Sequence, residues 1–140
     1  MFIKRIFAPV ILVTLLTIVT TSVFSANTKI ITYYFHGNVR CPTCHKMEQY
    51  TKEAIEENFK DELANGLLVF KAVNVDEKEN EHFISDYQLY TQSLIISYIE
   101  NGKETQHKNL TKIWEYAGDK KRFFSYVTTG ISGYLKDVQG

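Results

Sequence analysis

Hydrophobic residues in this chain change their spacing several times after residue 28, and the order of these changes restricts the fold. Lys29–Phe35 (KIITYYF) is β-branched and aromatic, which is typical of a buried strand. Beyond the turn-like His36-Gly37-Asn38, apolar residues recur at helical spacing, at Met47, Ala54, Ile55, Phe59 and Leu63. Asn65-Gly66 supplies a stop signal. A buried strand followed at once by an amphipathic helix indicates an α/β protein.

The rest of the chain continues this alternation. The expected elements are strand, short helix, strand, strand and helix, over Leu67–Val75, Glu79–Tyr87, Leu94–Ile99, Lys103–Lys108 and a stretch that Asp119 can cap. Leu67–Val75 is apolar on both faces in its first half, which predicts an interior strand. Asn101-Gly102 is a strong hairpin signal. Gly130 and Gly133 weaken the last helix by roughly 1 kcal/mol each relative to alanine.

The order β-α-β-α-β-β-α implies a four-stranded mixed sheet with helices on both faces. A length of 140 residues, of which 44% are hydrophobic and 23% charged, fits one globular domain and excludes a large multidomain protein. Most aromatic side chains are expected to pack in the core or on the sheet, among them Tyr33, Tyr34, Phe70, Phe83, Trp114, Phe123 and Phe124.

A targeting segment precedes the predicted domain, which spans residues 26–140. Met1–Ser25 carries the basic pair Lys4 and Arg5, then the apolar stretch Ile6–Val19, and no acidic residue. This pattern predicts a Sec-type signal peptide cleaved before Ala26. An uncleaved membrane anchor is the alternative, since the stretch approaches the ~20 residues that a membrane-spanning helix needs. Either way we expect an exported protein, in a bacterial periplasm or on the extracytoplasmic face of a membrane.

Both cysteines lie in Cys41-Pro42-Thr43-Cys44, between the first strand and the first helix. Pro42 suits the first helical position, which places Cys41 at the N-cap with its sulfur facing unpaired backbone N–H groups. The helix dipole and neighbouring Arg40 favour a thiolate there, and no acidic residue stands between His36 and Met47. We therefore predict that Cys41 is the low-pKa nucleophile and that Cys44 closes a disulfide with it.

These features resemble the thioredoxin superfamily. The resemblance rests on KIITYYF, on CPTC opening a helix, on Val73-Asn74-Val75-Asp76, and on LIISYIENGKE as strand, hairpin and strand. It implies a thioredoxin-like three-layer α/β sandwich and thiol–disulfide oxidoreductase activity, with Cys41 attacking, Cys44 resolving and Pro42 between them. Thioredoxins carry a cis-proline before the third strand. Here Ser93 and Leu94 occupy that part of the expected substrate groove.

The expected partners are client proteins with thiols or disulfides and an upstream thiol redox partner, in the membrane or soluble. We expect no cofactor and no resident metal. Membrane contact is expected only through an uncleaved N-terminal segment. A formal net charge of +0 gives no reason to expect nucleic-acid binding.

Other functions fit the same residues. CPTCH is also the C-x-x-C-H motif of c-type haem attachment, with His45 as proximal ligand and His36, His82 or His107 as distal candidates. The pair can also form a purely structural disulfide, or belong to a non-catalytic interaction or metal-binding module of the same fold.

Overall fold

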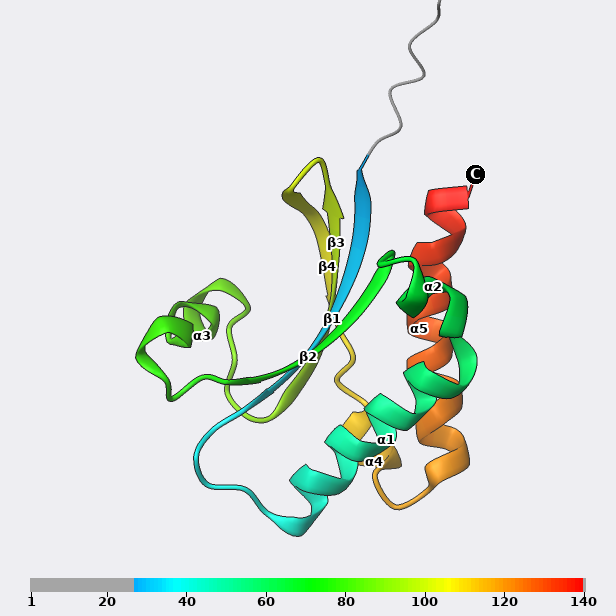
Figure 1. Ribbon diagram of the computed structural model, residues 1–140. Coiled ribbons are helices and arrows are strands. Elements are labelled where there is room, and N and C mark those ends of the chain that lie inside the picture. Colours follow the sequence, from blue (N-terminus) through cyan, green and yellow to red (C-terminus); the bar gives the residue numbers. More distant parts are fainter. Residues whose placement is uncertain (1–26, 140) are drawn as a thin grey trace, which may run out of the picture.

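The computed structural model describes residues 27–139, so the predicted targeting segment Met1–Ser25 lies outside the described residues. The sheet has four strands in the order β2-β1-β3-β4 (Figure 1). They span β1 (Thr28–His36), β2 (Leu68–Asn74), β3 (Ser93–Glu100) and β4 (Lys103–Asn109). β1 runs parallel to β2 and antiparallel to β3, and β3 pairs antiparallel with β4. The predicted four-stranded mixed sheet is confirmed.

The prediction of an interior strand over Leu67–Val75 is wrong, because β2 lies at the edge of the sheet and pairs with β1 alone. Its first residue, Leu68, is buried, whereas Lys71 and Ala72 are exposed. The interior positions belong to β1 and β3, and β3 is buried over its first six residues. At the hairpin after β3, Asn101 and Gly102 both have positive φ, as the Asn-Gly signal predicts.

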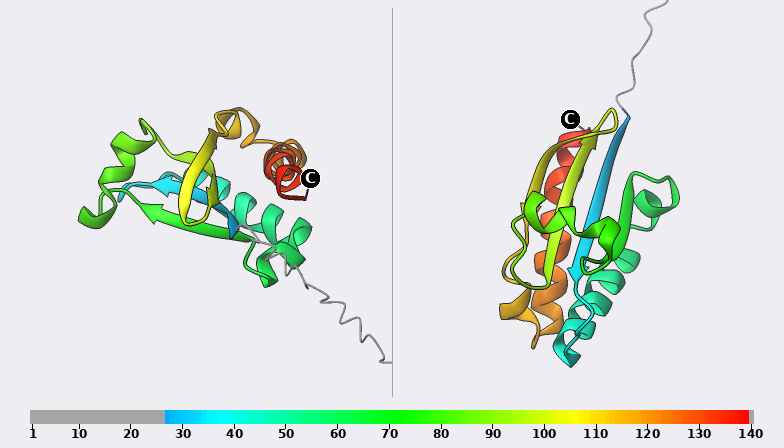
Figure 2. Two further views of the ribbon diagram at one scale, coloured as in Figure 1. Left: turned by 90° about the horizontal axis from the view of Figure 1, so that it is seen from above. Right: turned by 90° about the vertical axis from the view of Figure 1, so that its left-hand side faces the viewer.

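Helices cover the two faces of the sheet unequally. α1 (Pro42–Asn58) and α5 (Lys120–Gln139) pack against each other on one face, hereafter the α1/α5 face. The short α3 (His82–Asp86), preceded by the 3₁₀ turn η1 (Lys78–Asn80), lies on the opposite α3 face (Figure 2). A further short helix, α4 (Ile113–Tyr116), follows β4 and was not predicted.

The first predicted helix is divided in two. α1 ends at Asn58, Phe59 leaves the helical conformation with φ −133° and ψ 43°, and α2 (Lys60–Ala64) follows. The Asn58 side-chain amide donates to the Ala54 carbonyl, and the Phe59 side chain turns into the core at 6% exposure. The helix is therefore interrupted at Phe59, and the interruption allows the phenylalanine side chain to be buried in the core.

The hydrophobic core has two parts. The larger lies between the sheet and α1 and α5, and includes Ile30, Met47, Leu94, Ile96 and Phe123. The smaller lies on the α3 face, where Phe35, Val73, Leu89 and Ile95 are buried and are joined by partly buried aromatic rings. No helix within residues 27–139 is long and apolar enough to cross a membrane.

Candidate active site

The loop between β1 and α1 is tied to the end of β2. The Asn38 backbone N–H donates to Asp76 Oδ2 at 2.6 Å, and the Asn74 side-chain amide donates to Asn38 Oδ1 at 2.7 Å. A Cβ on Gly37 would lie 2.8 Å from Asp76 Oδ2, so only glycine fits there without displacing that carboxylate. This loop delivers the chain to the N-terminus of α1 at the lower end of the molecule in Figure 1.

Cys41 is the N-cap of α1 and Pro42 is its first residue, as predicted. The Cys44 backbone N–H donates to Cys41 Sγ at 3.1 Å, so the sulfur occupies the position that a capping oxygen usually takes. The two cysteines form a disulfide. The Cys41 residue is exposed, whereas Cys44 is 2% exposed. An incoming thiolate therefore reaches Cys41 and not Cys44.

A polar cluster that the sequence did not reveal supports the buried cysteine. The hydroxyl of Tyr34, on β1, donates to the Cys44 carbonyl at 2.7 Å. The Arg40 guanidinium forms an ion pair with Glu48 on α1, and its charge acts on the Tyr34 hydroxyl. Burial is the main cause that raises the pKa of Tyr34 to about 12, and the Arg40 charge opposes the rise. Glu48 lies just beyond the acid-free window His36–Met47, and its helical spacing from Cys44 was the available signal.

The two predicted groove residues start β3. Ser93 is 6% exposed, and its hydroxyl donates to the Thr91 carbonyl at 2.8 Å. Leu94 is fully buried and pairs in register with Tyr34, so its side chain belongs to the core. Residues 27–139 contain no cis peptide bond, in agreement with the expectation that the missing proline leaves a trans bond here. The groove role of Ser93 and Leu94 stays a prediction.

Trp114 fixes the segment before β3. Its indole N–H, on α4, donates to the Gln92 carbonyl at 3.0 Å, and the side chain is 39% exposed. The expectation that Trp114 packs in the core or on the sheet is not met, because α4 carries it to the surface. Two further apolar side chains, Val39 at 89% exposure and Tyr90 at 93%, stand in the loops after β1 and before β3.

The three histidines considered as distal haem ligands lie on different elements, β1, α3 and β4. His36 Nδ1 contacts the Gly37 carbonyl oxygen at 3.0 Å, whereas His82 pairs with Asp86 within α3. His107 pairs with Glu104 on β4. No group of three or more His, Cys, Asp or Glu side chains in residues 27–139 is placed to hold a metal ion.

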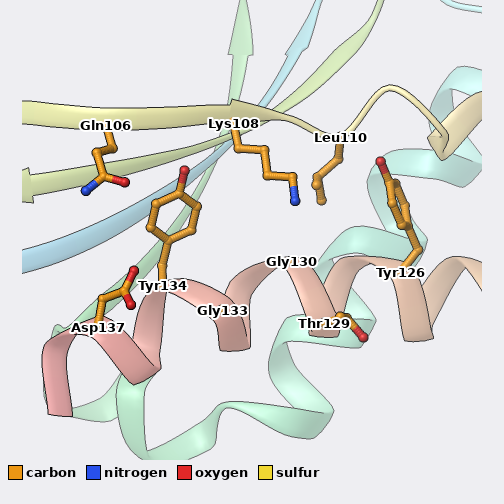
Figure 3. A pocket seen from close by; sticks show the side chains of 9 residues that line it. All are labelled: Gln106, Lys108, Leu110, Tyr126, Thr129, Gly130, Gly133, Tyr134 and Asp137. Carbon is orange, nitrogen blue, oxygen red and sulfur yellow. The ribbon is translucent and has the colours of Figure 1, made fainter. Parts of the chain in front are cut away.

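A separate groove of about 360 Å³ lies between β4 and α5 (Figure 3). Its lining includes Lys108 and Gln106 from β4, and Tyr134 and Asp137 from α5. Gly130 and Gly133 form the helix side of this groove. None of the predicted site residues lines it.

Comparison with known proteins gives structural matches only. No family model and no curated protein matches the chain. A thioredoxin from Fasciola hepatica is 22% identical, with a TM-score of 0.39 over 64% of this chain and 79% of that one. A thioredoxin from Thermus thermophilus is 17% identical, with a TM-score of 0.37 over 57% and 61%. A structure described as a malarial protein is 16% identical, with a TM-score of 0.39 over 57% and 79%.

The fold assignment rests on the arrangement of this chain itself. The four-stranded mixed sheet, with α1 and α5 on one face and α3 on the other, is the three-layer arrangement that the resemblance implies. The cysteine pair stands at the N-terminus of the helix that follows the first strand. The chain has a thioredoxin-like fold with a Cys-x-x-Cys disulfide at the start of its first helix.

Proposed function

We propose that this chain is an extracytoplasmic thiol–disulfide oxidoreductase that exchanges its Cys41–Cys44 disulfide with the thiols of protein clients. The observation that carries the proposal is the asymmetry of the pair, with one sulfur exposed at a helix N-terminus and the other buried behind it. A helix N-terminus stabilises a thiolate and so makes Cys41 both a good leaving group and a good nucleophile.

The exchange balances in two steps. A client thiolate attacks Cys41 Sγ, a client–Cys41 bond forms, the Cys41–Cys44 bond breaks, and Cys44 leaves as a thiolate. A second client thiolate then attacks the client sulfur of the mixed disulfide and releases Cys41 as a thiolate. The client dithiol has been oxidised and the chain reduced by two electrons. The reverse sequence reduces a client disulfide, and the upstream redox partner restores the starting state.

Trapping of the mixed disulfide tests the roles of the two cysteines. With Cys44→Ser, no internal thiol can release a client bound to Cys41, so mixed disulfides should accumulate. Non-reducing gels show them as additional bands of higher mass. Cys41→Ser removes the accessible sulfur and should trap few clients. Equal trapping by both variants would contradict the assignment, and no exchange of the wild-type pair with glutathione would contradict the proposed activity.

The haem alternative has less support from the same site. Both sulfurs that would bond to haem are bonded to each other, and two of the three distal candidates pair with carboxylates outside the cysteine site. A purely structural disulfide is also a weak explanation, because a loop of this length removes little entropy from the unfolded chain. An absorbance scan for a Soret band separates haem binding from thiol exchange.

The extracytoplasmic location rests on the Met1–Ser25 pattern alone. N-terminal sequencing of the protein recovered from fractionated cells tests it. We expect a chain that begins at Ala26 in the extracytoplasmic fraction. An intact N-terminus in the cytoplasmic fraction would contradict it.

A further inference from the structure

In the oxidised structure, the positive charge of Arg40 is paired with a carboxylate. Although Arg40 directly precedes Cys41, its guanidinium is paired with the Glu48 carboxylate. The two side chains are only 17% and 27% exposed. A part-buried pair of opposite charges is locally almost neutral, so Arg40 contributes much less positive potential at the sulfurs than its position in the sequence indicates.

The contacts place this ion pair beneath the cysteines. Glu48 follows Cys44 by four positions and Cys41 by seven, so the three residues share one face of α1. The Arg40 charge also acts on the Tyr34 hydroxyl, which donates to the Cys44 carbonyl. Among residues 27–139 the buried Arg40 Nε has no hydrogen-bond partner, and the guanidinium is held by its ion pair with Glu48. The Glu48–Arg40 ion pair therefore lies within electrostatic reach of Tyr34, which is hydrogen-bonded to Cys44.

We propose that Glu48 is a positioning residue that holds Arg40 in this ion pair and thereby limits how strongly the reduced Cys41–Cys44 pair is stabilised as a thiolate. The proposal rests on the proposed function and names a determinant of the redox bias of the same site. A stabilised thiolate favours the reduced form and makes a pair more oxidising. Glu48 therefore shifts the pair toward the reducing end of the range that its helix N-terminus allows.

Other charged groups at this end do not replace Glu48. The other titratable side chains in the first turn of α1 and at the adjoining ends of β1 and β2 are His45, Lys46, His36 and Asp76. Within residues 27–139 none of them forms an ion pair with Arg40 or Glu48. Asp76 instead accepts a hydrogen bond from the loop backbone.

Glu48→Gln tests the proposal by removing the carboxylate charge with little change of shape. We expect the acid dissociation constant of the thiol that ionises first, assigned to Cys41, to rise about three- to tenfold. The positive charge of Arg40 is then no longer neutralised by Glu48 and stabilises the thiolate. The equilibrium constant with glutathione should move by a similar factor toward the reduced protein. The first quantity is read from thiolate absorbance in the reduced protein, and the second from quenched redox mixtures.

Glu56→Gln is the matched control. Glu56 lies on the same helix and pairs with Lys52 at 3.8 Å, but the two side chains are 56% and 60% exposed. Glu56→Gln removes the same charge from α1. It should change neither the acid dissociation constant of the thiol nor the equilibrium constant with glutathione beyond error. Arg40→Gln should move both quantities in the opposite direction, because it leaves Glu48 uncompensated, and the double variant Arg40→Gln/Glu48→Gln should return close to the wild type.

Equal behaviour of Glu48→Gln and Glu56→Gln would overturn the proposal. So would a Glu48→Gln protein that is less stable to urea but has an unchanged thiol titration, since that is the result of a purely structural ion pair. The titration needs no client or redox partner. If the wild-type pair fails to exchange with glutathione, the proposed function falls, and the titration still decides the role of Glu48.

Discussion

The two faces of the sheet are stabilised by different means. On the α1/α5 face, long helices cover a hydrophobic core in which Ile30, Leu94, Ile96 and Phe123 are fully buried. On the α3 face, one short helix covers the sheet only in part. The rings of Tyr33, Phe35, Phe83 and Tyr87 pack there with centroids 5.1–6.3 Å apart. Burial of apolar area dominates the first face, and aromatic contacts with polar bonds hold the second.

A single carboxylate organises the polar part of the α3 face. Glu104, on β4, accepts hydrogen bonds from the Tyr87 and Ser97 hydroxyls. It also pairs with His107 Nδ1 at 3.0 Å, and the His107 ring packs edge-on against Tyr87. Tyr87 follows α3, so this network links the α3 segment to the far strand of the sheet. A small covering helix can therefore be retained without the area that α1 and α5 bury.

Truncation of one phenylalanine on each face should give the largest difference in stability between the two faces. Phe123→Ala removes a fully buried ring that also packs against Tyr50, and we expect it to lower the free energy of unfolding by about 3–5 kcal/mol. Phe83→Ala removes a partly buried ring and should cost at most about half as much. Urea unfolding measures both, and equal losses would contradict the distinction between the faces.

The hydroxyl of Tyr87 should matter more than a hydroxyl on the opposite face. Tyr87→Phe deletes a hydrogen bond to the Glu104 carboxylate, and we expect a loss of about 1.5 kcal/mol. Tyr126→Phe on α5 is the control, because the Tyr126 hydroxyl oxygen accepts a long hydrogen bond of 3.4 Å from the Lys112 N–H. This variant should change the free energy of unfolding by less than about 0.5 kcal/mol. If the two losses were equal, the carboxylate would not be what fastens α3.

The sequence predicted the elements best where the signal is local. The N-cap position of Cys41 follows from Pro42 and the end of the preceding strand, and the Asn101-Gly102 turn requires the positive φ angles that are observed. The order of elements then restricts the topology to few possibilities. These features involve residues close together in the chain, so their spacing is visible without a structure.

The errors concern contacts that the local sequence pattern does not specify. The hydrophobicity of β2 suggests an interior strand, but an edge strand covered from one side by α1 and α2 shows the same pattern. Trp114 reaches the surface on α4, and Arg40, just before the N-cap, pairs with Glu48 in the second turn of α1. No local spacing rule states which acid a part-buried arginine selects.

Alkaline unfolding should involve tyrosines of both faces. Burial raises the pKa of Tyr34 to about 12, and burial together with hydrogen bonding to Glu104 raises the pKa of Tyr87. Because unfolded tyrosines ionise near pH 10, the contribution of each is complete below about pH 10 and declines as the pH rises toward the folded-state pKa. Tyr34→Phe and Tyr87→Phe should each reduce the alkaline slope of the unfolding free energy by up to about 1.4 kcal/mol per pH unit.

Urea titrations at several pH values between 9 and 11 measure that slope. Tyrosine absorbance in the folded protein provides an independent check, since the ionisation of the two phenols should be delayed relative to the denatured chain. A wild-type slope that neither substitution changes would assign the alkaline transition to other groups.

The smallest expected effect is a difference in stability between alanine substitutions at two glycines of α5, for which the sequence predicts the same helix-weakening effect. In Figure 3 both lie on the helix side of the groove beneath β4. Apart from its own helical turn, a Cβ at Gly133 would meet no atom of the described residues within 4 Å, so Gly133→Ala should recover helix propensity and stabilise the fold by about 0.5–1 kcal/mol. A Cβ at Gly130 would lie 3.1 Å from Ile96 Cδ1 and from Leu110 Cδ2, and both neighbours are fully buried with little room to move. Gly130→Ala should therefore gain nothing or lose stability, and the thermal midpoints of the two variants should shift in different directions. Equal stabilisation by both would mean that the α1/α5 face tolerates an added methyl group, and that its packing is looser than its burial indicates.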